Sequence, residues 1–303
     1  MRRFKTVVPM HNLHLGDQLV QFGPGVYVGL IPDWLRADSL LKNLSRWDLA
    51  GFEACTHCFV HEYEAEALGS PDPLWKGPDP RSIQDAKIEL SYLANLALWL
   101  QRPGPIGFNL IFHAPEWSSR FSIQGTERCD RYLCHPDDAN QKITSEDIEP
   151  ASKLYGALTQ IPRHSAPWTA ISALIAALQM NREEIRHLLL WVALEALFGP
   201  EDGREITYRL SQRLALFLAS NRTEARELFG KAKRAYGFRS KVAHGKWKHD
   251  DETTAMTGFT EALLRRSLLR LMRDGDVTSK FLGQQRETYL DDLPFSEQKL
   301  GAP

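Results

Sequence analysis

The feature that most constrains the fold is a series of five long segments in which apolar residues recur at three- and four-residue spacing. Such spacing places apolar side chains on one face of an α-helix. The segments are 169–180, 183–198, 205–219, 223–238 and 253–273. Glycine, proline, serine or asparagine stands at the breaks between them, where helices are expected to stop. The sequence therefore predicts a compact all-α helical bundle over residues 167–275.

Residues 1–148 differ, because their short apolar runs are interrupted often by glycine and proline. Such runs predict strands, while residues 32–46 and 82–101 predict helices. The runs are 6–9, 25–30, 52–63 and 106–113. We therefore expect an α+β domain over residues 1–148. The polar stretch 137–149 could be a linker or a short helix start, and a linker is expected over 149–166. A loosely packed polar tail is expected over 276–303.

Composition excludes several classes of protein. The 303 residues are 43% hydrophobic and 25% charged, as in an ordinary globular protein. The net charge of −1 gives no global sign of a nucleic-acid partner, so any such surface must be local. No apolar run approaches the roughly 18 residues of a membrane span, and no signal-peptide core follows Met1. With too few cysteines for a disulfide scaffold, we expect a cytoplasmic protein with no membrane partner.

The stretch 231–248 is the most informative part of the chain. It holds eight basic residues and no acid, in a chain whose charges otherwise balance. Three aromatic residues, Tyr236, Phe238 and Trp247, are interleaved with the basic ones. This combination suits phosphate contact and base stacking, although a charge run is also typical of a solvated helix face. The stretch alone leaves both interpretations open.

Arg239 and His244 form an R-x4-H pair within this stretch. RNA cleavage needs no metal when the 2′-hydroxyl is the nucleophile, but it needs a proton-transfer group and a cation facing the phosphate. Histidine suits the first role and arginine the second. The spacing alone is weak, because Arg182 and His187 repeat it; we interpret that pair as surface and core positions of a helix. Gly245, by contrast, predicts a helix end that leaves His244 near solvent.

Three blocks of the helical half carry a resemblance to a known family. They are WVALEALF at 191–198, RLSQRLA at 209–215 and YGFRSKVAHG at 236–245. In order and spacing they resemble the Apea-like branch of HEPN domains, with its "ALEALF" helix, "R-L-x-x-R" helix and "R-S-x-x-x-H-G" signature. The resemblance implies an all-α HEPN helical bundle over 167–275 and does not extend to the first half. It also implies a metal-independent endoribonuclease without a cofactor, in which two subunits dimerise around a shared cleft.

The resemblance implies roles for particular residues. Arg239 would bind and stabilise the scissile phosphate, and His244 would be the general acid–base. Ser240, counted with this catalytic group, stands where many HEPN members have asparagine. Glu195 matches an acidic position of the family's second helix, although a surface carboxylate or a structural ion pair is the alternative. The residues expected to contact RNA are Lys241, Lys246, Lys248 and Tyr236.

The biological role expected from the resemblance is that of a toxin or antiviral defence effector that cuts RNA. Its 2′-oxygen attack would leave a cyclic phosphate and a 5′-hydroxyl end. Because such an effector must be restrained, we expect the first domain to sense a trigger or to hold the nuclease in check. A HEPN domain that binds RNA or a protein without cutting is the alternative. A transcriptional or structural dimer with a solvated basic face is a third interpretation.

The four cysteines raise the separate possibility of a zinc site. Cys55 and Cys58 have zinc-ligand spacing, and Cys129 and Cys134 could complete four ligands. However, the apolar run 52–60 predicts a strand, in which Cys55 and Cys58 would face opposite sides unless a turn intervenes. Buried, inert cysteines are the usual case. We therefore expect no metal, with zinc at these four cysteines as the alternative.

Overall fold

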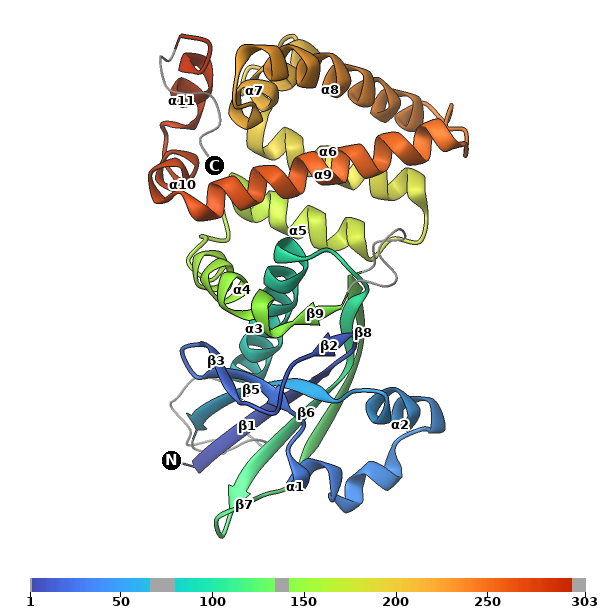
Figure 1. Ribbon diagram of the computed structural model, residues 1–303, viewed down its shortest axis with the longest axis vertical. Coiled ribbons are helices and arrows are strands. Elements are labelled where there is room, and N and C mark those ends of the chain that lie inside the picture. The colour runs from blue at the N-terminus through green and yellow to red at the C-terminus, as the bar shows by residue number, and fades with distance from the viewer. Residues whose placement is uncertain (1, 66–79, 134–141, 296–303) are drawn as a thin grey trace. The chain divides into compact units, whose positions relative to one another are not determined.

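The computed structural model describes residues 2–65, 80–133 and 142–295 (Figure 1). The chain divides into two compact units, Met1–Thr159 and Gln160–Pro303. The described residues of the first unit combine a β-sheet with helices, and those of the second are helical. The coarse prediction of an α+β region followed by an all-α region is therefore confirmed.

The first unit is built on an antiparallel sheet. Its strands are β1 (Arg2–Met10), β3 (Val20–Gly23), β4 (Val26–Leu30), β5 (His57–Ala65), β6 (Ile106–Trp117), β7 (Arg120–Phe121) and β8 (Gly125–Leu133). The strand order is β3-β4-β5-β1-β6, and both β7 and β8 pair with β6. Two further short strands, β2 (Leu13–His14) and β9 (Ile143–Thr144), pair in parallel as a separate sheet. The central position of β1 explains why its apolar residues are buried on both faces.

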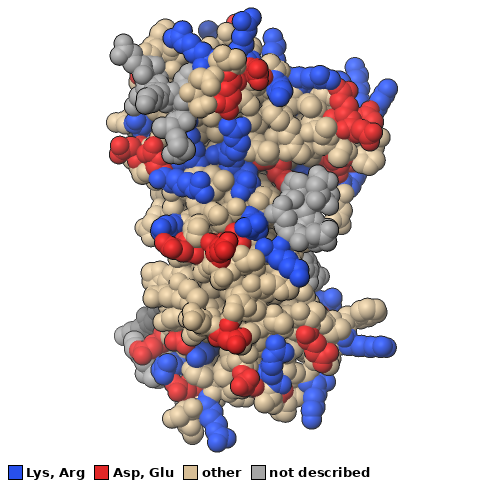
Figure 2. Space-filling view, in the orientation of Figure 1, with Lys and Arg blue, Asp and Glu red and all other residues tan. Residues whose placement is uncertain are grey.

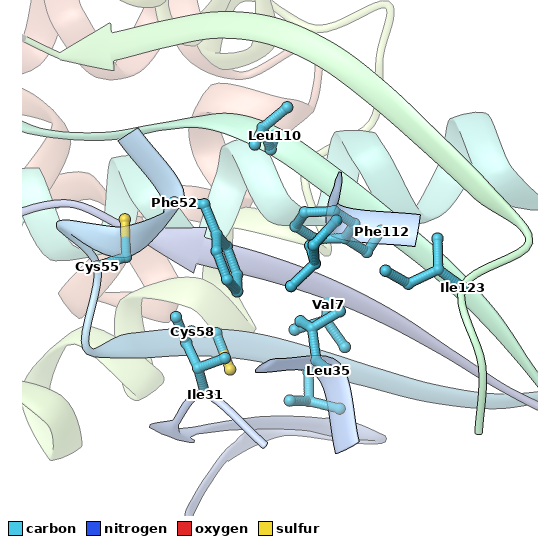
Figure 3. Close-up of a cluster of buried hydrophobic side chains, with 11 residues drawn as sticks. Val7, Ile31, Leu35, Phe52, Cys55, Cys58, Leu110, Phe112 and Ile123 are labelled. Atoms are coloured by element: carbon cyan, nitrogen blue, oxygen red, sulfur yellow. The ribbon is translucent and has the colours of Figure 1, made fainter. Parts of the chain in front are cut away.

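Helices cover both faces of this sheet. On one face lies α3 (Pro80–Gln101), where the Ser91 hydroxyl is 2.9 Å from Nε2 of His61 on β5. On the other face lie α1 (Asp33–Arg36), the 3-10 helix η1 (Ser39–Asn43) and α2 (Arg46–Glu53). Their apolar side chains, including Leu35 and Phe52, join Cys58 and Phe112 of the sheet in one buried cluster (Figure 3). Because side chains alternate between the two faces along each strand, the sheet contributes to a hydrophobic core on either side.

Much of the linker predicted over 149–166 is a helix of the first unit, α4 (Ser145–Leu158). A capping box between Thr144 and Asp147 starts this helix. The Asp147 carboxylate also pairs with Arg102 at the end of α3, at 2.8 Å. The linker over 149–166 was therefore wrong, while the alternative of a helix start before Pro150 is confirmed. The helix buries an apolar stripe formed by Ile148, Ala151, Leu154, Tyr155 and Leu158.

The second unit begins with the five predicted helices. They are α5 (Ala166–Leu178), α6 (Glu183–Phe198), α7 (Ile206–Leu218), α8 (Arg222–Ala243) and α9 (Asp251–Arg273). Three of them start at a side chain that caps a backbone amide, namely Ser165, Asn221 and Asp250. None of the helices in the described ranges is long and apolar enough to cross a bilayer.

The described part of the predicted polar tail is packed rather than loose. It forms α10 (Gly275–Leu282) and α11 (Arg286–Asp292), which bury Phe281 and Leu290. Arg213 of α7 is only 3% exposed, and its Nη2 lies 2.6 Å from both Glu287 and Asp291 of α11. The prediction of a loose tail was therefore wrong, because these few apolar residues and acids complete the surface of the bundle.

Candidate functional site

The candidate site is centred on the C-terminal end of α8. The amide of Gly245 donates to the Val242 carbonyl, and the amide of Lys246 donates to the Lys241 carbonyl at 2.8 Å. This pair of bonds is a Schellman motif, and it requires the left-handed φ of +67° that Gly245 adopts. The helix end predicted at Gly245 is confirmed.

His244 is the last residue before this turn and is exposed. Its backbone amide donates to the Ser240 carbonyl at 3.1 Å. Across the ranges that the structure describes, no hydrogen bond or ion pair engages the imidazole of His244. Both ring nitrogens are therefore open to a ligand arriving from solvent.

Arg239 lies half-buried on α8 and is held by Glu195 of α6. Its Nε is 3.1 Å from Oε1 of Glu195, and its Nη2 is 3.5 Å from Oε2. The Tyr236 hydroxyl donates to the same Oε1 at 3.0 Å. The guanidinium is oriented by one carboxylate along one edge, while Nη1 has no hydrogen-bond partner among the described residues. Planar arginine can present that remaining edge to a phosphate.

Tyr236 supports this pair from within the core. Its ring is 9% exposed and packs edge-to-face on Trp191 of α6, with centroids 4.9 Å apart. Burial, together with the charge of Glu195, raises the pKa of Tyr236 to about 12. The ring of Tyr236 therefore offers little exposed surface for base stacking, and its contact with RNA stays a prediction. Phe238 is buried as well, at 4% exposure.

The basic side chains of the stretch 231–248 point mostly to solvent. Those predicted to contact RNA, Lys241, Lys246 and Lys248, are all exposed. Lys241 Nζ lies 4.0 Å from the centroid of the Phe238 ring, while Arg234 is paired with Glu252. Figure 2 shows Asp and Glu side chains beside the Lys and Arg side chains on the helical unit. Acidic side chains, such as Glu252 paired with Arg234, therefore lie among the basic side chains of this stretch.

Ser240 is exposed next to Arg239. Its carbonyl takes part in the helix end, but in the described part of the chain its hydroxyl bonds to neither Arg239 nor His244. The structure therefore brings Arg239 together with Glu195 and Tyr236, and it leaves Ser240 and His244 exposed on the last turns of the same helix.

The second R-x4-H pair has the placement that was interpreted for it. Arg182 is exposed at the N-cap of α6, and His187 on α6 is fully buried. Burial lowers the pKa of His187 to about 4, although a hydrogen bond to the backbone of Ala235 offsets part of that shift. His187 is therefore neutral near pH 7 and is shielded from any substrate.

Cys55 and Cys58 lie in the apolar cluster of the first unit (Figure 3). Their thiols donate to the carbonyls of Gly51 and Leu30, and burial raises the pKa of Cys55 to about 12 and that of Cys58 as well. The strand predicted over 52–60 was wrong at its start, because α2 extends to Glu53 and Cys55 lies in the turn that follows. Both cysteines therefore join the same core cluster.

The remaining zinc candidates cannot be placed. Cys134 and the side chain of Cys129 lie outside the described residues. Within the residues that are described, no group of three or more His, Cys, Asp or Glu side chains could hold a metal ion.

No protein-family model, no curated protein and no solved structure matches this chain. The family resemblance therefore rests on its three sequence blocks, which the structure places in one unit. The "ALEALF" block is the C-terminal half of α6, the "R-L-x-x-R" block lies in α7, and the signature ends α8. Sequence reasoning did not find the contacts around the site made by Trp191 and Tyr236, because they join residues 45 positions apart (236 − 191).

Proposed function

We propose that this protein is a metal-independent endoribonuclease whose reacting groups are Arg239 and His244. The observation that carries the proposal is that one of these two side chains is unengaged and the other is held in place, near the end of the same helix. His244 is exposed and unengaged among the described residues, whereas Arg239 is held by Glu195 with one edge of its guanidinium open. Phosphate transesterification requires a group that can transfer a proton and an oriented cation that faces the phosphate.

In the proposed reaction, the neutral imidazole of His244 accepts the proton of the 2′-hydroxyl as the 2′-oxygen attacks phosphorus in line. Arg239 stabilises the charge that builds on the non-bridging phosphate oxygens. The bond from phosphorus to the 5′-oxygen breaks, and the imidazolium of His244 returns the proton to that leaving oxygen. The products are a 2′,3′-cyclic phosphate and a 5′-hydroxyl end, and no atom of water or metal enters the balance.

The exposed lysines around the helix end supply the affinity in this proposal. Lys241, Lys246 and Lys248 flank His244 in sequence and face solvent. Each phosphate that they neutralise releases condensed counterions, so RNA binding should weaken steeply as salt rises. Such phosphate contacts do not depend on the RNA sequence, which suits a nuclease that recognises single-stranded RNA by its backbone.

We further propose that two copies meet through α6. Val192 is 43% exposed, and the half-buried Leu188 and Leu189 lie one turn before it. Glu195 follows Val192 by three residues, so it is a neighbour on the helix surface. A second copy packed on Val192 would bring the two Arg239–Glu195 pairs close to each other. Sedimentation of the wild type against Val192→Lys tests this, and a wild-type monomer at micromolar concentration rules it out.

The role that we propose for such a nuclease is a toxin or antiviral effector of the cytoplasm, restrained by the first unit. Expression of the full chain and of residues 160–303 in the same host compares their toxicity. Equal growth in the two cultures would contradict restraint by the first unit.

The Glu195–Arg239 ion pair also favours a second candidate, a module that binds RNA or a protein without cutting. A carboxylate that neutralises Arg239 lowers its attraction for phosphate, as it would in a purely structural pair. This candidate predicts RNA binding by the wild type with no new 5′-hydroxyl ends.

The deciding experiment is cleavage of single-stranded RNA in EDTA by the wild type, His244→Ala and Arg239→Ala. Matched controls are His249→Ala, an exposed histidine of the same loop, and Arg234→Ala, an exposed arginine of the same helix. The proposal expects cleavage by the wild type and both controls, and loss in the two site variants. Cleavage that survives His244→Ala, or that EDTA abolishes, overturns it.

A further inference from the structure

The buried imidazole of His187 lies where α6, α8 and α9 meet. Its Nε2 accepts the indole N–H of Trp191 at 3.0 Å. An indole N–H can only donate, so Nε2 carries no proton and the proton of the neutral ring is on Nδ1. Nδ1 lies 3.2 Å from the hydroxyl of Thr257 on α9, and the Ala235 backbone of α8 also bonds to the ring. The tautomer is thereby fixed from three helices.

One side of this imidazole packs against the loop that follows His244. Trp247 lies in the loop between α8 and α9, and its ring centroid is 5.4 Å from that of His187. The residues on either side of it, Lys246 and Lys248, are exposed. The buried indole Nε1 of Trp247 finds no acceptor among the described residues, so the ring is held by packing alone.

Thr257, which lies next to His187, is connected by hydrogen bonds to the other end of this loop. The Thr257 hydroxyl donates to the carbonyl of Thr253, one turn earlier on α9. The Thr253 hydroxyl donates in turn to the carbonyl of Lys248, at 2.8 Å. His187 and Thr257 therefore contact both the apolar anchor of the loop and the helix that receives it.

The partner of His187, Trp191, supports the other half of the site. Its ring packs on Tyr236, whose hydroxyl bonds to Glu195, which in turn orients Arg239. One buried histidine–tryptophan pair thus braces the arginine through Tyr236 and the loop next to His244 through Trp247.

We propose that His187 is a positioning residue of this site, which holds Trp247 and thereby sets the loop that follows His244. The inference rests on the proposed ribonuclease function, but its structural claim can be tested without activity. His187 touches no substrate in this scheme; it acts through Trp247 on one side and Trp191 on the other. Displacing a reacting group by about 1 Å is enough to cost about 100-fold in rate.

The experiment uses the full chain labelled with 5-fluorotryptophan, which gives a fluorine resonance for each of eight tryptophans. Trp247→Phe assigns the resonance of Trp247. The test variant is His187→Phe, which keeps a ring but removes both nitrogens. The control is Ser267→Ala on α9, a buried hydroxyl that donates to Leu263 within its own helix. Turnover of single-stranded RNA is measured in parallel, as kcat and KM.

The expected result is a shifted or broadened Trp247 resonance in His187→Phe, and a kcat about 10- to 100-fold lower with KM within about twofold. The control should change neither. His187→Gln should restore part of the kcat, because its amide can accept from Trp191 and donate to Thr257. If His187 only stabilised the fold, His187→Gln and His187→Phe of equal stability would have the same kcat.

Two results overturn the proposal: an unchanged Trp247 resonance in folded His187→Phe, or an unchanged kcat in an enzyme whose wild type cleaves. If the wild type does not cleave, the proposed function fails while the Trp247 resonance still decides the positioning claim. If His187→Phe does not fold, Thr257→Val removes the Nδ1 acceptor at similar volume and takes its place, with the same outcomes.

Discussion

Two arginines of the helical unit are paired with carboxylates in opposite ways. Arg213 is 3% exposed, and its Nη2 contacts Glu287 and Asp291 at 2.6 Å each, while its Nη1 reaches the Phe198 carbonyl. The Arg239 side chain is 34% exposed and meets one carboxylate, that of Glu195, along one edge. The guanidinium of Arg213 is therefore surrounded by acceptors, whereas that of Arg239 has N–H donors that remain available to a ligand.

The difference separates a structural ion pair from a site that can take a ligand. A buried arginine that lost its carboxylates would leave an uncompensated charge, so losing these partners is expected to destabilise the fold strongly. A partly exposed pair contributes little to stability, typically under about 1 kcal/mol, because water screens it. Arg239 is thus free to exchange part of its pairing for a phosphate without endangering the bundle.

The largest effects should come from removing each arginine. Arg213→Ala is expected to lower the free energy of unfolding by about 3 kcal/mol, since it removes a buried guanidinium and its contacts with Glu287 and Asp291, which then keep, among the described residues, only Arg209 and Arg286 nearby. Arg239→Ala is expected to lower it by less than about 1 kcal/mol but to reduce RNA cleavage by at least about 100-fold. Urea unfolding and cleavage rates of the two variants check the comparison. Equal losses of stability would erase the distinction.

The next effect in size concerns the buried histidine beside the site. The pKa of His187 is lowered to about 4 in the folded chain, from 6.5 when exposed. The unfolded chain therefore binds a proton that the folded chain does not, and stability is lost as pH falls from 6.5 toward 4. The loss from His187 alone should reach about 2 kcal/mol at pH 5. When unfolding is measured at pH 7 and pH 5, the wild type should therefore lose about 2 kcal/mol more stability than His187→Gln, which keeps the losses from other buried histidines such as His61.

A smaller effect is expected when Glu195 loses its charge. Glu195→Gln keeps a hydrogen-bond acceptor for Arg239 but no longer neutralises it, so RNA should bind more tightly while the arginine is held less firmly. We expect KM to fall and kcat to drop about tenfold, or about 1.4 kcal/mol in the barrier. The phenol of Tyr236 should also titrate at lower pH, because Glu195 helps to raise its pKa. A kcat that rises in this variant would mean that Glu195 only inhibits.

Local signals in the sequence were enough for much of this unit. Helical spacing and the breaks at Gly199, Ser220 and Gly245 predicted the five helices, and Gly245 also predicted the exposure of His244. These features depend on neighbours within one turn, which sequence periodicity records directly.

Long-range pairing escaped prediction. The stretch 231–248 holds aromatics suited to stacking, but Tyr236 and Phe238 face the core, which only the arrangement of α6 and α8 decides. The acids of α11 looked like a solvated tail until the buried Arg213 gave them a partner. In both cases the sequence showed which residues are polar or aromatic, but it did not show whether their side chains point to the core or to solvent.

The smallest effect tests the backbone at the site itself, with two glycines of the block 236–245. Gly237 is helical, and a Cβ there would meet no atom within 4 Å, whereas Gly245 has a φ of +67°. Gly237→Ala should therefore raise the free energy of unfolding by about 0.5–1 kcal/mol through helix propensity. Gly245→Ala should lower it by about 1 kcal/mol, because a side chain is strained in the left-handed region. If Gly237→Ala leaves the fold more stable but weakens RNA binding, the open face of α8 lies against the substrate; if binding is unchanged, the substrate is confined to the helix end around His244.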